Sequence, residues 1–166
     1  MLQANVAQLF EYQRERLQLL LVCGNLDAPI AINHQHASPA DLVGHLNLIH
    51  PDRIQVIGAP EINWATQQHA VRVSRHMDEI IASHPPAVIV ADGCPIPATV
   101  REACERSSTA LFSTPQAAAT VIDLLRIWLS RQLAETTELH AVMMDVLGMG
   151  VLITGDSGVG KSDLGV

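Results

Sequence analysis

The sequence predicts an α/β fold: an amino-terminal domain with a parallel or mixed sheet and flanking helices, followed by the first β-hairpin and the phosphate-binding loop of an incomplete second domain. Short apolar runs alternate with stretches of helical periodicity up to about residue 130, and this alternation is typical of parallel sheets. The end of the chain instead has two apolar runs around a glycine-rich turn, ahead of a glycine-rich loop. We therefore expect a domain over residues 1–130, a linker over 131–139 and the beginning of a second domain over 140–166.

The composition limits the possible functions. The chain has 166 residues, of which 48% are apolar and 16% charged, with a net charge of −7, so it can bury one sizeable core. No apolar run approaches the ~20 residues that cross a bilayer, and the amino terminus lacks a signal peptide, so we expect a cytoplasmic protein without membrane contact. Clustered Lys and Arg are missing, so we expect no nucleic-acid partner. Three cysteines without CxxC spacing predict neither a disulfide framework nor a zinc site.

Elements in the first half follow from periodicity and turn residues. Apolar residues recur at helical spacing from Val6, and the next apolar run is continuous up to Gly24. A Ser-Pro turn precedes a segment of helical character that Pro51 ends. The predicted elements are a helix over 4–16, a strand over 17–23, an extended piece over 30–33, a turn over 38–41 with a helical segment up to residue 48, and a strand over 53–58.

The second half alternates in the same way. The Pro85-Pro86 pair ends a long helical pattern, and the apolar run after it is typical of a strand buried on both faces. Pro97 and Pro115 each stand at the beginning of a further helix. The predicted elements are a helix over 60–83, a strand over 87–91, a helix over 97–106, a strand over 110–113 and a helix over 114–133.

Residues 140–146 and 151–154 are two apolar runs that we expect to pair as a β-hairpin across the glycine-rich turn 147–150. If Val146 pairs with Val151, His140 lies opposite the first residues of the following loop. A histidine there could be stabilised as a cation by a phosphate, or could relay a proton when neutral. The alternative is a solvated histidine at a strand edge.

The hairpin leads into the phosphate-binding loop, residues 155–162, with the sequence GDSGVGKS. This is the GxxxxGK(S/T) pattern, whose glycines let backbone N–H groups surround a phosphate without obstruction by Cβ atoms. Lys161 would reach the β- and γ-phosphates, and the Ser162 hydroxyl would ligate Mg²⁺. The alternative is a glycine-rich surface turn.

Taken together, these blocks resemble HPr kinase/phosphorylase. His140-Ala-Val-Met-Met-Asp-Val146, the glycine turn, the next strand and GDSGVGKS occur in the order and spacing that begins the catalytic domain of that family. Upstream, Leu42-Val-Gly-His-Leu-Asn-Leu-Ile-His-Pro51 and Arg53-Ile-Gln-Val-Ile-Gly58 are similar to its amino-terminal domain, especially in proteobacterial members. The phosphate loop alone is shared with many nucleotide hydrolases, but the other blocks are more restrictive.

This resemblance implies a bifunctional enzyme that regulates the bacterial phosphotransferase system. Members phosphorylate a serine of the phosphocarrier protein HPr with ATP or pyrophosphate and Mg²⁺, reverse this by phosphorolysis, and form homohexamers. By resemblance, His140 and Lys161 are catalytic and Ser162 is the Mg²⁺ ligand. The residues expected to hold the phosphoryl donor are Gly155, Asp156, Ser157, Gly158, Val159, Gly160, Lys161 and Ser162.

Other functional residues of the family, including its general base and second metal ligand, fall beyond Val166. We therefore expect a truncated chain that has no kinase or phosphorylase turnover by itself. Two further functions stay open: a non-catalytic binding or assembly module, and an unrelated P-loop NTPase or small kinase. Magnesium-dependent binding of a nucleotide or pyrophosphate at residues 155–162 distinguishes the enzyme from the module.

Overall fold

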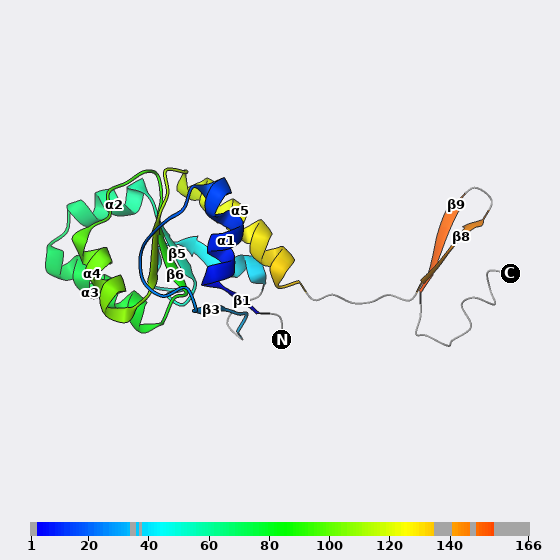
Figure 1. Ribbon diagram of the computed structural model, residues 1–166, viewed down its shortest axis with the longest axis horizontal. Coiled ribbons are helices and arrows are strands. Elements are labelled where there is room, and N and C mark those ends of the chain that lie inside the picture. Colours follow the sequence, from blue (N-terminus) through cyan, green and yellow to red (C-terminus); the bar gives the residue numbers. More distant parts are fainter. Residues whose placement is uncertain (1–2, 34–35, 37, 135–140, 147–148, 155–166) are drawn as a thin grey trace. The chain divides into compact units, whose positions relative to one another are not determined.

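The computed structural model describes residues 3–33, 36, 38–134, 141–146 and 149–154 (Figure 1). The chain divides into two compact units, Met1–Ala134 and Glu135–Val166. Within the described part of the chain, no helix is long and apolar enough to cross a membrane.

A five-stranded mixed sheet forms the centre of the first unit. Its strands are β2 (Leu20–Cys23), β4 (Val43–His45), β5 (Ile54–Ile57), β6 (Ala87–Val90) and β7 (Ala110–Ser113). The strand order is β2-β7-β6-β5-β4, in which β4 to β7 are parallel and β2 is antiparallel to β7. The expected mixed sheet is therefore confirmed. β5 and β6 are buried along their whole length, as central parallel strands with helices on both faces must be.

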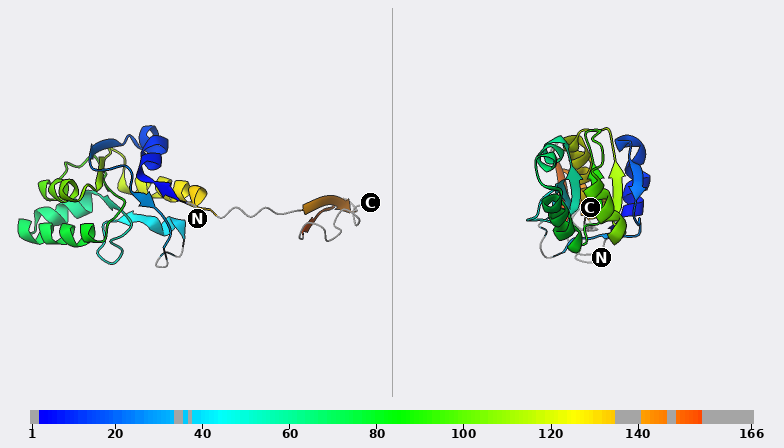
Figure 2. Two further views of the ribbon diagram at one scale, coloured as in Figure 1. Left: turned by 60° about the horizontal axis from the view of Figure 1, so that its bottom comes forward. Right: turned by 90° about the vertical axis from the view of Figure 1, so that its left-hand side faces the viewer.

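Helices cover both faces of this sheet (Figures 1 and 2). They are α1 (Val6–Leu17), α2 (Ala59–Thr66), α3 (Ala70–Ala82), α4 (Ala98–Ser107) and α5 (Ala118–Gln132). α1 and α5 pack on one face, where Ile89 of β6 lies in the core. α3 and α4 pack on the other, with Val88 and Val90 of the same strand. Alternate residues of β6 thus enter opposite cores, as the strand period of two requires.

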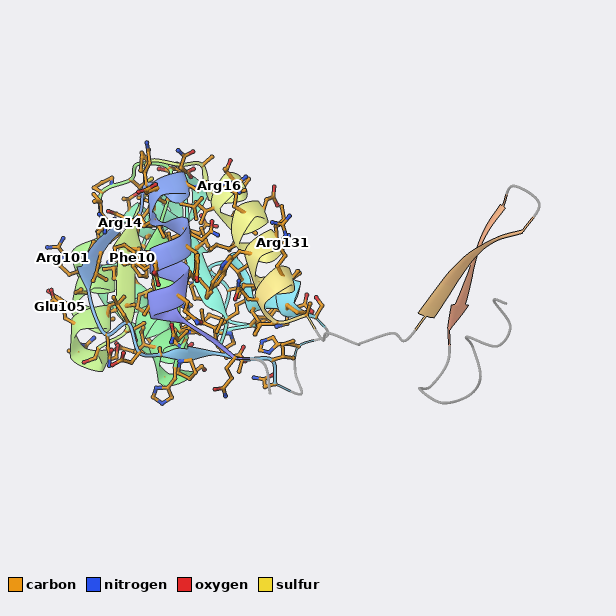
Figure 3. All side chains as sticks on the ribbon, turned by 45° about the vertical axis from the view of Figure 1, so that its right-hand side comes forward. Phe10, Arg14, Arg16, Arg101, Glu105 and Arg131 are labelled. Atoms are coloured by element: carbon orange, nitrogen blue, oxygen red, sulfur yellow. The ribbon has the colours of Figure 1, made fainter. Side chains whose placement is uncertain are left out.

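Helix α1 is fixed at its beginning and along its inner face. The Asn5 side chain accepts a hydrogen bond from the Gln8 backbone N–H at 2.8 Å, and Gln8 Oε1 accepts one from the Asn5 N–H at 3.1 Å, which forms a capping box. Phe10 stacks on Phe112 of β7 with 5.4 Å between ring centroids. The Arg14 guanidinium lies 5.6 Å from the Phe10 centroid (Figure 3). The helix is therefore held by its cap and by an aromatic stack on the sheet.

The expected helical segment up to Leu48 is wrong. A short 3-10 helix, η1 (Pro39–Leu42), is followed directly by strand β4. β4 pairs in parallel with β5, with Val43 opposite Ile54 and His45 opposite Val56. Val43 is fully buried. The sheet edge therefore determines the conformation of this segment, and tertiary context overrides its local helical character.

The single helix expected over 60–83 is also wrong, because α2 and α3 are separate helices with a break after Thr66. The Thr66 hydroxyl donates to the Asn63 carbonyl oxygen at 2.8 Å, so the last turn of α2 closes on itself. α3 then buries Val73, Met77 and Ile80 along one face, whereas α2 has no fully buried residue. The break lets α3 align its own apolar face with the core.

A two-stranded ladder, β1 (Ala4–Asn5) with β3 (Pro29–Ile30), completes the first unit. The second unit contains an antiparallel hairpin of β8 (Ala141–Val146) and β9 (Met149–Thr154). The hairpin was predicted, but its register was not, since Val146 pairs with Met149 and Ala141 with Thr154. Only two residues separate the strands, which is the loop length that β-hairpins favour.

We expect Gly24→Ala to lower the free energy of unfolding much more than Gly93→Ala. Both glycines have positive φ, 96° and 65°, so each alanine carries a left-handed penalty of about 1–2 kcal/mol. Only at Gly24 does the new Cβ collide, because it would lie 2.1 Å from the Thr109 carbonyl oxygen, whereas at Gly93 the nearest atom is 3.9 Å away. Urea unfolding should give a difference of roughly 2 kcal/mol between the variants. If both variants lose the same free energy of unfolding, the close approach of the Thr109 carbonyl to Gly24 is contradicted.

Candidate functional site

The carboxyl ends of the parallel strands form the first candidate site, since open α/β sheets bind ligands at this edge. Asp92 follows β6, and its carboxylate bridges two helices. Oδ2 accepts from the Ala59 backbone N–H at 2.7 Å, and Oδ1 accepts from the Ala118 N–H at 2.9 Å. These are the first residues of α2 and α5, so one side chain caps both helices.

These contacts set the charge state of Asp92. The hydrogen bond from Ala59, then that from Ala118, lowers the pKa of the Asp92 carboxyl below its ordinary value, and the nearby His45 acts in the same direction. The positive ends of the two helix dipoles stabilise the same anion. Asp92 has a positive φ of 60°, a conformation that Asp adopts more readily than most residues. The carboxylate is therefore held ionised at this edge.

Glu61 places a second carboxylate beside the first. Its Oε2 accepts from the Gly58 backbone N–H at 2.9 Å, and its Oε1 lies 3.4 Å from His45 Nδ1. Gly58 leaves room for both acids, because a Cβ there would lie 2.7 Å from Asp92 Oδ2 and 3.3 Å from Glu61 Oε2. His45, Glu61 and Asp92, from three separate parts of the chain, thus meet at one edge.

A cavity of about 440 Å³ opens next to this cluster. Its walls come from the connection after β4 and from helices α2 and α3. The lining is mostly apolar, with one carboxylate from Glu61. Such a cavity can bury a small molecule, which makes it the second candidate site.

The described residues do not support metal or thiol chemistry at this edge. Among them, no group of three or more His, Cys, Asp or Glu side chains could hold a metal ion. Burial, together with Asp92 and Glu61, raises the pKa of the Cys94 thiol, and burial raises the pKa of Cys104 to about 12. Both thiols therefore stay protonated near neutral pH and are poor nucleophiles.

The residues predicted from the phosphate-loop motif, the hairpin and the family resemblance lie outside the described residues. These are His140, Gly155, Asp156, Ser157, Gly158, Val159, Gly160, Lys161 and Ser162. The hairpin that leads to them is described, and its last pair joins Ala141 to Thr154. In sequence, His140 directly precedes Ala141, and Gly155 directly follows Thr154.

Sequence reasoning missed the edge formed by His45, Glu61 and Asp92. One signal was available for Asp92, because an acidic residue followed by glycine stands directly after a buried strand. His45 and Glu61 carry no such signal, because the sequence predicts a helical segment at His45 and places Glu61 inside a long helix. Their proximity follows from the strand order.

Comparisons with known proteins identify relatives over nearly the whole chain. Residues 4–129 match the family described as HPr Serine kinase N terminus, and residues 131–166 match the HPr Serine kinase C-terminal domain. An HPr kinase/phosphorylase of Azoarcus sp. (strain BH72) is 56% identical over 164 residues, which are 99% of this chain and 52% of that protein. An HPr kinase/phosphorylase of Aromatoleum aromaticum is 54% identical over 164 residues, again 99% of this chain and 52% of that protein. One of Paraburkholderia xenovorans is 58% identical over 129 residues, which are 78% of this chain and 40% of that protein. The chain thus spans about half the length, or less, of these curated relatives.

Asp92→Ala should lower the free energy of unfolding by about 1–3 kcal/mol at neutral pH, because two helix N-termini lose their cap. Folding lowers the pKa of Asp92, so its charge contributes fully to the free energy of unfolding above the ordinary aspartate pKa of about 3.9. This contribution is lost as the pH falls through the lower pKa of the folded state. Urea unfolding at a series of pH values should therefore show that the difference in free energy of unfolding between Asp92→Ala and the unsubstituted chain becomes smaller below about pH 4.

The matched control is Asp123→Ala, which removes an exposed carboxylate from α5 and should change stability by less than about 0.5 kcal/mol. If the free energy of unfolding lost in Asp92→Ala is the same at every pH, the charge of Asp92 has no role in stability.

Proposed function

Because this chain belongs to the HPr kinase/phosphorylase family, we propose that it takes part in the Mg²⁺-dependent phosphorylation of a serine of HPr and in the phosphorolysis of phosphoseryl-HPr. The family matches over residues 4–129 and 131–166 support this, as does the name shared by the relatives. ATP or pyrophosphate is the proposed phosphoryl donor, and HPr is the proposed protein partner. A homohexamer is the proposed assembly.

One observation carries the proposal for this chain: strand β9 ends at Thr154 and continues in sequence directly into GDSGVGKS. A strand directly before this motif is the first part of the strand–loop–helix context of a phosphate loop. We assign the phosphates to the backbone of residues 155–162, with Lys161 neutralising the charge of the transferring group and Ser162 ligating Mg²⁺.

We assign His140 a role next to the transferred phosphate. The hairpin register supports this, because His140 and Gly155 each stand one residue beyond the paired Ala141 and Thr154. An imidazole near a phosphate can donate a hydrogen bond as a cation or relay a proton when neutral. Phosphoryl transfer depends mainly on positioning and on electrostatic stabilisation, so these residues would act as a charged cradle.

A non-catalytic binding module is the second candidate. The separate first unit favours it, because Met1–Ala134 has its own sheet and its own two cores. In this function the first unit would bind a ligand or partner while residues 135–166 would contribute no chemistry.

We expect Mg²⁺-ATP or Mg²⁺-pyrophosphate to bind the 166-residue chain in titration calorimetry, and Lys161→Ala to weaken this binding by at least about tenfold. The reason is that Lys161, the only lysine in the sequence, supplies the cation of the motif. Arg101→Ala is the matched control, since it removes an exposed cation from α4 (Figure 3).

Binding that Lys161→Ala abolishes and Arg101→Ala preserves would support the kinase assignment. If neither donor binds while the circular dichroism spectrum is that of a folded α/β protein, the binding-module function is favoured instead.

A further inference from the structure

The cavity beside Glu61 has the size and position of a small-molecule site. Its volume of about 440 Å³ falls in the range of about 300–1,000 Å³ typical of such sites. It opens at the carboxyl ends of β4 and β5, the edge at which open parallel sheets bind ligands. Leu46, Leu48 and Ile80 give it an apolar lining.

One wall of the cavity is held in place by a buried side chain. Gln55 of β5 is fully buried, and its Oε1 accepts from the Asn47 backbone N–H at 3.1 Å. Its Nε2 donates to the carbonyl oxygens of His50, at 2.8 Å, and Arg53, at 3.1 Å. The connection between β4 and β5 is thereby fixed before any ligand arrives, which reduces the ordering cost of binding.

The polar end of the cavity favours a cation. The Glu61 side chain lines the cavity and is 21% exposed, and the Asp92 carboxylate also lies next to Gly58. The imidazole of His45, 3.4 Å from Glu61, is the group that faces these two acids. The Glu61 carboxylate therefore gives this end of the cavity its negative charge.

Helix α2, which carries Glu61, also offers an aromatic surface to the cavity. Trp64 is 41% exposed and lines the cavity together with His76, whose ring meets it edge-on with 5.4 Å between centroids. The exposed Arg72 guanidinium already lies 6.0 Å from the Trp64 centroid, so the indole accepts a cation from its own chain. An apolar ligand body could cover the remaining exposed indole surface.

From these observations we propose that the cavity binds a small organic cation, with an apolar body packed against Trp64 and a protonated amine paired with Glu61. This site lies in the first unit and does not depend on the phosphate loop. A negative result for the kinase assignment would therefore leave this proposal unaffected, and a negative result here would leave the kinase assignment unaffected.

Three probes with the same phenyl-ethyl body and different charges test the proposal: 2-phenylethylamine, 2-phenylethanol and 3-phenylpropionate. The 166-residue chain has two tryptophans, Trp64 in the cavity wall and Trp128, which is 7% exposed. Their indole N–H signals in ¹⁵N NMR spectra separate binding at the cavity from general effects, and Trp64→Phe assigns them. We expect the amine to shift the Trp64 signal alone, with an affinity at least about fivefold above that of the alcohol and with the carboxylate weakest.

Glu61→Gln should remove the preference for the amine and leave the affinity for the alcohol within about twofold. Glutamine can keep the hydrogen bond from the Gly58 N–H, because Glu and Gln both serve at this position of a capping box, so the variant should fold. Glu105→Gln, an exposed acid on α4 (Figure 3), is the matched control and should change nothing.

Three results would overturn the proposal: no shift of the Trp64 signal at millimolar amine, equal affinity for the three probes, or an amine preference that survives Glu61→Gln. If Glu61→Gln itself perturbs the Trp128 signal, Trp64→Leu is used in its place, and titration calorimetry with 2-phenylethylamine should then show loss of amine binding.

Discussion

The carboxylate of Asp92 is the constraint on which the carboxyl edge of the sheet depends. Its two oxygens hold the first N–H groups of α2 and α5, which follow different strands and contribute to different faces of the unit. Fixing the beginning of α2 also fixes Glu61 one turn later, because its side chain closes back on the Gly58 N–H. The position of the acid that lines the cavity is thus a consequence of how the two helices are capped.

Much of the fold was predictable from the sequence, and the errors have a common origin. The strands at 87–91 and 110–113 were predicted correctly because burial on both faces requires continuous apolar runs, which single segments reveal. β4 was missed because three residues at a sheet edge, Val-Gly-His, carry too little local signal against a preceding Ser-Pro turn. The hairpin strands were found but their register was shifted by two residues, since alternation fixes which face a residue occupies and leaves shifts of two undetermined. Both errors concern the pairing of one strand with another, which the residues of a single segment do not determine.

The two candidate sites differ in the same respect. The predicted phosphate loop consists of eight contiguous residues, so its chemistry can be predicted without knowing the fold. His45, Glu61 and Asp92 are spread over 48 positions and meet only because β4, β5 and β6 end at one edge. A contiguous motif therefore predicts a site from sequence, whereas a site assembled by strand order appears only when the topology is known.

A cavity in the first unit and a phosphate loop in the second raise the question of how they could influence each other. A ligand that binds only the folded first unit stabilises it by RT ln(1 + [L]/Kd), and this free energy stays within that unit unless the second unit contacts it differently in the bound state. If such a contact exists, thermodynamic linkage requires reciprocity: an organic cation that alters the affinity for Mg²⁺-pyrophosphate must have its own affinity altered by the same factor. Factors of one for both ligands would make the first unit a binding module that acts independently of the predicted phosphate loop.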